Sequence, residues 1–209
     1  MTDAVFGPDA FQAHTGATEA QMADVEAYRA LLAEWSAKMN LVGPSAMESF
    51  WLRHAWDSAQ LLSIAPERRV WADIGAGAGF PGLILGIFSK ETPGAHVHLI
   101  ESMAKKCRFL TAAAEALALP VTVHNARAED LRLTGVEVVT ARACAPVDRL
   151  LGYAAPLFRQ GAIGLFLKGQ GVDAEIAEAH KSWRFRADLI PSRSSAEGRI
   201  VKVEAISRG

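Results

Sequence analysis

The stretch WADIGAGAGFPG, residues 71–82, completes an apolar run and contains four glycines and a proline. A strand that ends in so many glycines brings backbone close to a ligand, because a residue without Cβ leaves room for close approach. Residues 77–82 also have the G-x-G-x-x-G spacing of dinucleotide-binding loops. The stretch therefore predicts a ligand-binding turn between a strand and a helix, and its surroundings indicate the fold and the ligand.

From residue 70 onward, short β-rich runs alternate with helical runs. The expected strands are 70–76, 96–102, 121–125, 136–143 and 162–169, and helical runs lie at 103–117 and 146–158. This alternation is typical of an α/β, Rossmann-like fold with a doubly wound, mostly parallel sheet. The tail, 185–206, has two strand-like runs joined by a Ser/Gly-rich connection. We therefore expect a C-terminal antiparallel hairpin.

The first part of the chain predicts a helical cap. Apolar residues recur at helical spacing over 18–40, where Thr18 and Gln21 form a capping-box pattern. A second helix is expected to start at Ser45, with Glu48 as its capping partner, and to run through residue 62. The chain thus divides into a cap, 1–66, and a sheet domain, 67–209, packed as one unit.

Composition limits the class of protein. The chain has 209 residues, half of them hydrophobic, and a net charge of -1. Cys107 and Cys144 lack metal-type spacing, so we expect free thiols in a reducing compartment and no metal site. The first residues lack the bases and apolar core of a signal peptide, and no run approaches the roughly 18 apolar residues that span a bilayer. These features predict a soluble, cytoplasmic protein.

Charge is unevenly distributed along the chain. Residues 1–50 hold seven acids and two bases, which leaves 16 acids and 20 bases in the remainder. A mildly basic body is compatible with a local phosphate-binding face, but so modest an asymmetry also fits ordinary solvated charge.

Two ligands compete for the glycine turn, a dinucleotide and S-adenosylmethionine. Asp73 lies inside the motif, where its carboxylate would repel a pyrophosphate but could hold the ammonium of a methionine moiety. Pro81 removes an N–H from the turn that would otherwise bind phosphate. Glu101 ends the second strand, in position for ribose hydroxyls, and Glu129 follows the third, near an adenine amine. S-adenosylmethionine is favoured, with an NAD(P)-dependent oxidoreductase as the alternative.

A set of motifs in fixed order extends this interpretation. They are NLVG (40–43), RHAWDS (53–58), DIGAGAGFPG (73–82), ESMAKKCRFL (101–110), NARAEDL (125–131), TARACAPVDRLL (140–151) and LKGQ (167–170). Together they resemble the bacterial small-subunit ribosomal RNA methyltransferase G family, also called glucose-inhibited division protein B. The resemblance implies a class I S-adenosylmethionine-dependent methyltransferase fold. It also implies methylation of guanine N7 in the decoding-region hairpin of 16S rRNA.

The resemblance places cofactor contacts on particular residues of this chain. Those matched to the family are Gly75, Phe80, Ala128, Glu129 and Arg142. Adding the residues proposed above and their neighbours, the expected cofactor-binding set is Asp73, Gly75, Gly77, Gly79, Phe80, Glu101, Ser102, Ala128, Glu129 and Arg142.

Guanine N7 carries an in-plane lone pair, so its methylation requires alignment and no general base. Arg142 and Lys168 end neighbouring strands, and neither motif offers a carboxylate partner, so we expect them to be the catalytic cations. The expected RNA-binding residues are His54, Arg127, Lys168 and Arg199. The predicted partner is the small ribosomal subunit or its precursor, with no DNA or membrane partner, and the protein is expected to be a monomer. A non-catalytic, cofactor-sensing RNA-binding protein remains the second alternative.

Overall fold

A computed structural model describes residues 6–209 of the chain. Its helices are α1 (Pro8–Thr15), α2 (Glu19–Met39), α3 (Pro44–Glu48), the π-helix η1 (Phe50–Trp56), α4 (Asp57–Ala59), the 3₁₀-helix η2 (Gln60–Ser63), α5 (Gly82–Ser89), α6 (Ala104–Ala116), α7 (Val147–Phe158) and α8 (Val172–Ala179). Its strands are β1 (Val70–Ile74), β2 (His96–Glu101), β3 (Val121–Asn125), β4 (Val138–Arg142), β5 (Ile163–Lys168), β6 (Trp183–Pro191) and β7 (Arg199–Arg208).

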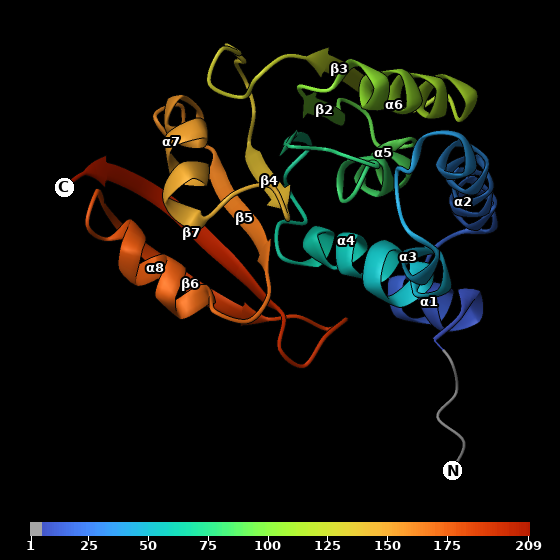
Figure 1. Cartoon of the computed structure of the whole chain (residues 1–209), viewed down its shortest axis with the longest axis horizontal. Coiled ribbons are helices and arrows are strands. Elements are labelled where there is room, and N and C mark those ends of the chain that lie inside the picture. Colours follow the sequence, from blue (N-terminus) through green and yellow to red (C-terminus); the bar gives the residue numbers. More distant parts are fainter. Residues whose placement is uncertain (1–5) are drawn as a thin grey trace.

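The strands form one sheet in the order β3-β2-β1-β4-β5-β7-β6 (Figure 1). Strands β1 to β5 are parallel, whereas β7 is antiparallel to both β5 and β6. The predicted doubly wound sheet with a C-terminal antiparallel hairpin is therefore confirmed. The strand expected over 70–76 ends at Ile74, because Gly75 adopts a φ of 73° and turns the chain away from the sheet.

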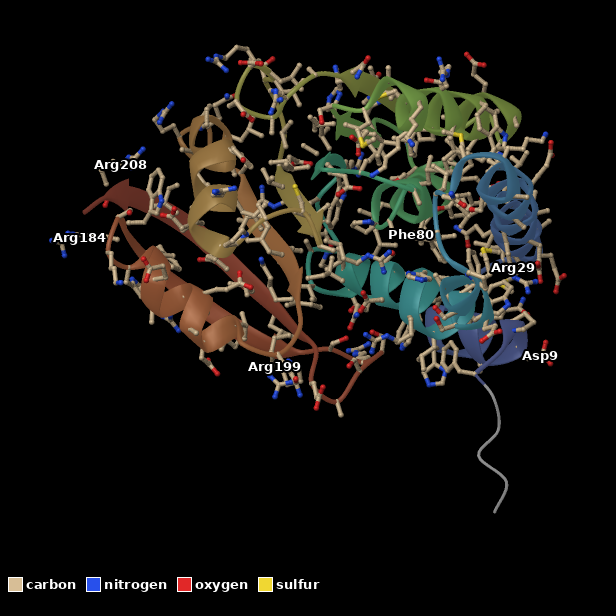
Figure 2. All side chains as sticks on the ribbon, in the orientation of Figure 1. Asp9, Arg29, Phe80, Arg184, Arg199 and Arg208 are labelled. Carbon is tan, nitrogen blue, oxygen red and sulfur yellow. The ribbon has the colours of Figure 1, made fainter. Side chains whose placement is uncertain are left out.

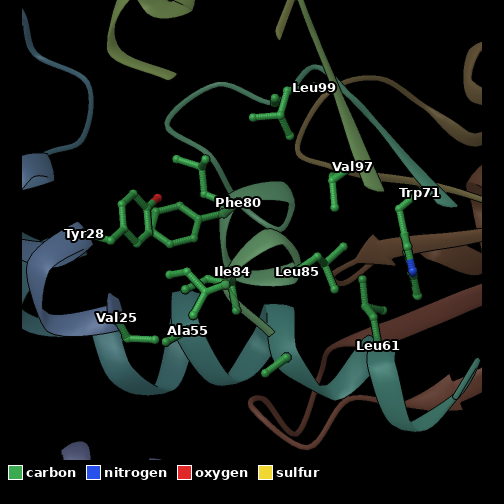
Figure 3. Close-up of a cluster of buried hydrophobic side chains, with 14 of the residues drawn as sticks. Val25, Tyr28, Ala55, Leu61, Trp71, Phe80, Ile84, Leu85, Val97 and Leu99 are labelled. Carbon is green, nitrogen blue, oxygen red and sulfur yellow. The ribbon is translucent and has the colours of Figure 1, made fainter. Parts of the chain in front are cut away.

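Two hydrophobic cores cover the two faces of the sheet. On one face, α1, α2 and the segment from η1 to η2 pack with α5 and α6. On the other face, α7 and α8 cover β4, β5 and β7. In the close-up of the first core, Tyr28 and Ala55 from the cap surround Phe80 and Ile84 (Figure 3). Cap and sheet thus share one apolar interior.

The first predicted helix has the expected start and end. Thr18 accepts a hydrogen bond from the Gln21 backbone N–H, the Gln21 side chain accepts from the Thr18 N–H, and α2 then runs to Met39. Asn40 closes this helix in the left-handed conformation. The capping box therefore specifies this end of the cap locally.

The second predicted helix is wrong in two respects. It begins at Pro44 rather than at Ser45, and no side chain caps it. Proline suits the first helical position because it has no N–H that needs a partner there. The helix is also divided, since residues 50–56 form a π-helix whose wider turn buries Phe50 with Ala55 and Trp51 with Trp56.

Two further helices lie outside the predicted set. Helix α1 precedes the capping box and buries Phe11, and α8 follows β5 and buries Val172 and Ala179. Both helices have only eight residues, which is too short for a strong periodic signal. None of the helices in residues 6–209 is long and apolar enough to cross a membrane. The predicted cap includes residues 1–5, which lie outside the described part of the chain.

Candidate functional site

The carboxyl ends of the parallel strands meet at one edge of the sheet. Strand β1 lies between β2 and β4, so the chain order changes direction beside β1. Ligands of open α/β sheets bind at such a switch point. Glu101, Arg142 and Lys168 are the last residues of β2, β4 and β5, so the sheet places these predicted residues along this edge.

Hydrogen bonds to the end of β2 hold the glycine turn in place. The backbone N–H groups of Gly75 and Ala76 donate to the Ile100 carbonyl, and the Gly77 N–H donates to Glu101 Oε2 at 3.1 Å. The second Glu101 oxygen accepts from the Met103 N–H at 2.8 Å. Glu101 thus fixes the shape of the turn, a role that the sequence does not indicate.

The glycines of the turn have different surroundings. A Cβ on Gly77 would have only the Gly75 carbonyl within 4 Å, at 3.6 Å, so this position borders open space. A Cβ on Gly75 would lie 2.5 Å from Cys144 Sγ and 2.9 Å from its Cβ. A bulky residue at Gly75 would therefore disturb the fold, because Cys144 packs over this position. Gly79 is closed by Leu83 and by the Tyr28 hydroxyl.

Asp73 lies beneath the turn and is fully buried. Its Oδ2 accepts a hydrogen bond of 2.9 Å from the Gly82 N–H at the start of α5. Its Oδ1 is buried without a hydrogen-bond partner among the described residues. Burial raises the pKa of this carboxyl to about 7, against a smaller lowering by the Gly82 hydrogen bond. The unpartnered oxygen is the atom that a ligand ammonium would need.

Phe80 lies at the centre of a stack of side chains behind the turn. The His54 ring stacks on it at a centroid distance of 4.8 Å, and the Arg142 guanidinium lies 4.9 Å from its ring centre. Burial, together with the charges of Arg142 and Arg53, lowers the pKa of His54 to about 4. Both imidazole nitrogens are buried without partners within the described structure, so His54 is a neutral wall.

The two predicted catalytic cations have carboxylate partners from outside their own motifs. Arg142 Nη1 donates to the Arg53 carbonyl at 2.8 Å and lies 3.6 Å from Asp57 Oδ2. Lys168 Nζ donates to the Ala145 carbonyl at 2.6 Å and to Glu175 Oε2 at 2.7 Å. The partners come from the cap and from α8, which lie outside the motifs of the two cations.

A cleft of about 950 Å³ opens beside these groups. Residues from α3, η1, the ends of β4 and β5 and the loop between β6 and β7 form its walls. Four predicted residues line it, namely His54, Arg142, Lys168 and Arg199. In Figure 2, Arg199 lies at one end of the β6–β7 hairpin, away from Arg184 and Arg208 at the other.

The remaining predicted residues lie away from this cleft. Ser102, Arg127 and Glu129 are exposed beyond the ends of β2 and β3, on the far side of the glycine turn. Ala128 is half-buried and lines a small apolar cavity with Ile74 and other residues. Arg127 is thus separate from the other predicted RNA-binding residues. The described residues hold no group of three or more His, Cys, Asp or Glu side chains suited to a metal ion.

The sequence does not show the partners of the two cations, Asp57 and Glu175, or the contacts of the serines in the 192–195 loop. Asp57 shares a helix face with Arg53 and His54, a spacing that fits either a local ion pair or a wall of the cleft, and the structure places all three residues along the cleft. The serine-rich loop was read as a plain connection. Their partners lie far away in the chain, so no local spacing could reveal them.

Comparisons with known proteins bear on the family and the fold of the chain. The profile of the family described as rRNA small subunit methyltransferase G matches residues 21–197. A protein of that name from Caulobacter vibrioides is 56% identical over 206 residues, covering 99% of this chain and 95% of the relative. One from Methylorubrum extorquens is 50% identical over 188 residues, covering 89% of each. In fold, the chain is similar to a SAM-dependent methyltransferase from Aquifex aeolicus, with a TM-score of 0.55, 16% identity, and coverage of 82% of this chain and 97% of that one.

Proposed function

The chain belongs to the rRNA small subunit methyltransferase G family, and from this premise we propose that it methylates ribosomal RNA with S-adenosylmethionine as the donor. More specifically, we propose N7 of a guanine in the decoding-region hairpin of 16S rRNA as the acceptor. The observation that carries the proposal is a glycine turn, open beside Gly77, next to a cleft lined by cations at the same sheet edge: Cys144 lines the cleft and packs over Gly75.

The residues of the turn fit S-adenosylmethionine. Gly77 leaves a space that a Cβ would fill, and Asp73 Oδ1 is a buried acceptor in need of a donor. The methionine portion has an ammonium group but no phosphate, so the missing N–H of Pro81 is no loss. We propose that S-adenosylmethionine is bound by Asp73, Gly75, Gly77, Gly79, Phe80, Glu101, Ser102, Ala128, Glu129 and Arg142. When bound, S-adenosylmethionine supplies an electrophilic methyl group.

The chemistry at the base requires positioning above all. The N7 lone pair is available near neutral pH, so no residue has to remove a proton before the methyl group is transferred. Holding the acceptor in line and excluding water can contribute about 7–11 kcal/mol. We propose that Arg142 and Lys168 hold guanine O6 or a flanking phosphate and leave N7 free, unlike the usual bidentate arginine–guanine contact.

The carboxylate partners suit a product that is cationic. Methylation at N7 gives the guanine ring a positive charge, which two unpaired cations would oppose. Asp57 lies beside Arg142, and Glu175 lies beside Lys168. The cleft therefore offers hydrogen-bond donors with little net positive charge next to the base.

The RNA backbone requires a second set of contacts. Arg53, from η1, and Arg199, from the start of β7, both line the cleft, where they suit phosphates. With a net charge of -1, few phosphates can be neutralised overall, so binding should depend only weakly on salt. We propose that folded RNA in the small subunit or its precursor is the substrate, that DNA and membranes are not partners, and that the protein acts as a cytoplasmic monomer.

The experiment that tests this proposal measures transfer of labelled methyl groups. Purified protein is incubated with small ribosomal subunits from cells that lack it, and with a short isolated hairpin. We expect N7-methylguanosine in the decoding region of the subunits and little in the hairpin. Tight binding of NADH without any response to S-adenosylhomocysteine would refute the proposal in favour of an oxidoreductase. Binding of S-adenosylhomocysteine without transfer to any ribosomal RNA would indicate a non-catalytic sensor.

A further inference from the structure

A single carboxylate joins three parts of the cleft. Asp57, at the junction of η1 and α4, directs Oδ1 toward the loop between β6 and β7, where it accepts hydrogen bonds from the hydroxyls of Ser194 and Ser192. Its Oδ2 lies 3.6 Å from Arg142 Nη1 at the end of β4. The cap, the hairpin loop and the central sheet thus meet at one side chain.

Neighbouring contacts reinforce this junction. Gln60, which is almost fully buried, donates to Asp57 Oδ1 at 3.0 Å and accepts from the Arg193 N–H at 2.8 Å. Ser194 is also buried. The side chain of Asp57 is only 17% exposed and that of Arg142 only 19%, so their attraction is little screened by solvent.

The hydrogen bond and the ion pair of Arg142 are both made by one nitrogen, while the guanidinium lies over the Phe80 ring. Within residues 6–209, Nη1 makes both the hydrogen bond to Arg53 and the ion pair to Asp57. A guanidinium has donors on Nε and Nη2 as well, in a rigid plane. Fixing Nη1 therefore determines the direction of the other donors, which remain for a ligand in the cleft.

We propose that Asp57 is the positioning residue of the site: it orients the Arg142 guanidinium and holds the 192–195 loop against the cap. This inference rests on the proposed function, because it assigns Arg142 to the substrate. Asp57 itself touches neither base nor donor in this arrangement. It acts through Arg142, and the loop contacts hold the carboxylate in the required direction.

Asp57→Asn tests the proposal, because the amide keeps the size of the side chain and removes its charge. We expect kcat on small subunits to fall about tenfold to a hundredfold, the range for a lost charge-assisted hydrogen bond. Asp24→Asn is the matched control, since the similarly sheltered Asp24 pairs with Lys90 at 2.9 Å, between α2 and the end of α5, and does not line the cleft. The control should leave kcat and KM unchanged.

Two further variants separate orientation of Arg142 from anchoring of the loop. Ser194→Ala removes a loop contact and keeps the carboxylate, so it should raise KM for subunits and keep kcat within about threefold. In an Arg142→Ala background, Asp57→Asn should lower kcat far less than in the wild type, because the guanidinium that Asp57 orients is already absent. Three results would each overturn the proposal. They are an unchanged kcat in Asp57→Asn, a loss of kcat in Ser194→Ala as large as that in Asp57→Asn, and additive effects on kcat in the double variant.

A measurement that does not need activity completes the test. In protein labelled with ¹⁵N-arginine, a fixed Arg142 guanidinium should give separate, slowly exchanging Nη signals, which average in Asp57→Asn. Averaged Nη signals in the wild type would overturn the proposal even if Asp57→Asn failed to fold. If the wild type methylates no ribosomal RNA but its Arg142 signals behave as expected, the proposed function fails and the positioning role stands.

Discussion

Gly77→Ala gives the sharpest test of where the methyl donor lies. The added methyl group would meet only the Gly75 carbonyl, at 3.6 Å, which is ordinary van der Waals contact. The protein therefore has room for it. The cost to the fold comes from the backbone, because Gly77 has a φ of 59°, in the left-handed region.

The magnitude follows from these two facts. A left-handed conformation costs a residue with Cβ about 1–2 kcal/mol. For a chain of this length, that lowers Tm by about 2–8 °C. If the donor occupies the space beside Gly77, the methyl group also intrudes on a packed contact, at about 1–3 kcal/mol. This second cost corresponds to an increase in Kd of about fivefold to a hundredfold.

Gly94→Ala is the matched control for backbone strain. Gly94 has a φ of 77° and nothing within 4 Å of its Cβ position, and it precedes β2 at the opposite edge of the sheet. Both variants should therefore lose similar Tm by differential scanning calorimetry. Titration calorimetry with S-adenosylhomocysteine should show weaker binding for Gly77→Ala alone. Equal affinity in the two variants would refute the placement of the donor at this turn.

Four other predictions follow from the site. Arg142→Ala and Lys168→Ala should each lower turnover at least about tenfold, with a smaller effect on the stability of the fold. Neither variant should change the pH–rate profile, and an acid limb that disappears in either of them would disprove a mechanism without a base. Glu101→Ala should weaken S-adenosylhomocysteine by about 1–3 kcal/mol and also loosen the turn, seen as faster hydrogen exchange at the Gly77 N–H; unchanged affinity and exchange would contradict both roles. Because the pKa of Asp73 is raised to about 7, the fold favours the protonated carboxyl, and the stability that this provides is lost as the pH rises from about 4 to above 7. Asp73→Asn should therefore raise Tm at pH 8 more than at pH 5. An equal change in Tm at both pH values would argue against a raised pKa. Because the pKa of His54 is lowered to about 4, the fold favours the neutral imidazole, and the stability present above pH 6.5 should decline as the pH falls toward 4. His54→Gln should reduce that decline, measured as the free energy of unfolding in urea titrations. The same decline in both proteins would exclude His54 as its source.

Local sequence determined the elements of the sheet and the turn. The strand over 121–125 and the capping box at Thr18 have the predicted bounds, because β-propensity and capping depend on neighbours in the chain. The order of strands and helices sufficed for the parallel sheet, since crossovers of this kind follow one hand. The glycines indicated a turn after β1 for the same reason, since their backbone freedom is a property of the residue, although the strand ends at Ile74 and not at residue 76 as predicted.

The divided cap helix shows where local rules gave way to packing. Residues 45–62 were predicted as one helix, yet the chain widens into a π-helix at 50–56. This turn buries Phe50 and Trp51 with Ala55 and Trp56 against the rest of the core. The burial of these large side chains outweighs the poorer hydrogen-bond geometry, and its size depends on what α1, α2 and the glycine turn present opposite them.

Only the tertiary structure decided the partners of the cations. The motifs that contain Arg142 and Lys168 offer neither cation an immediate carboxylate partner, but Asp57 and Glu175 reach them from separate elements. Asp57 accepts a hydrogen bond from the Ser194 hydroxyl, which lies 137 residues away along the chain. An ion pair forms where the packing of the sheet, cap and hairpin brings two charges together in a place sheltered from water, and chain spacing does not encode that place. The sequence alone therefore determines the glycine turn and the cations at the strand ends, and packing determines how those cations are held.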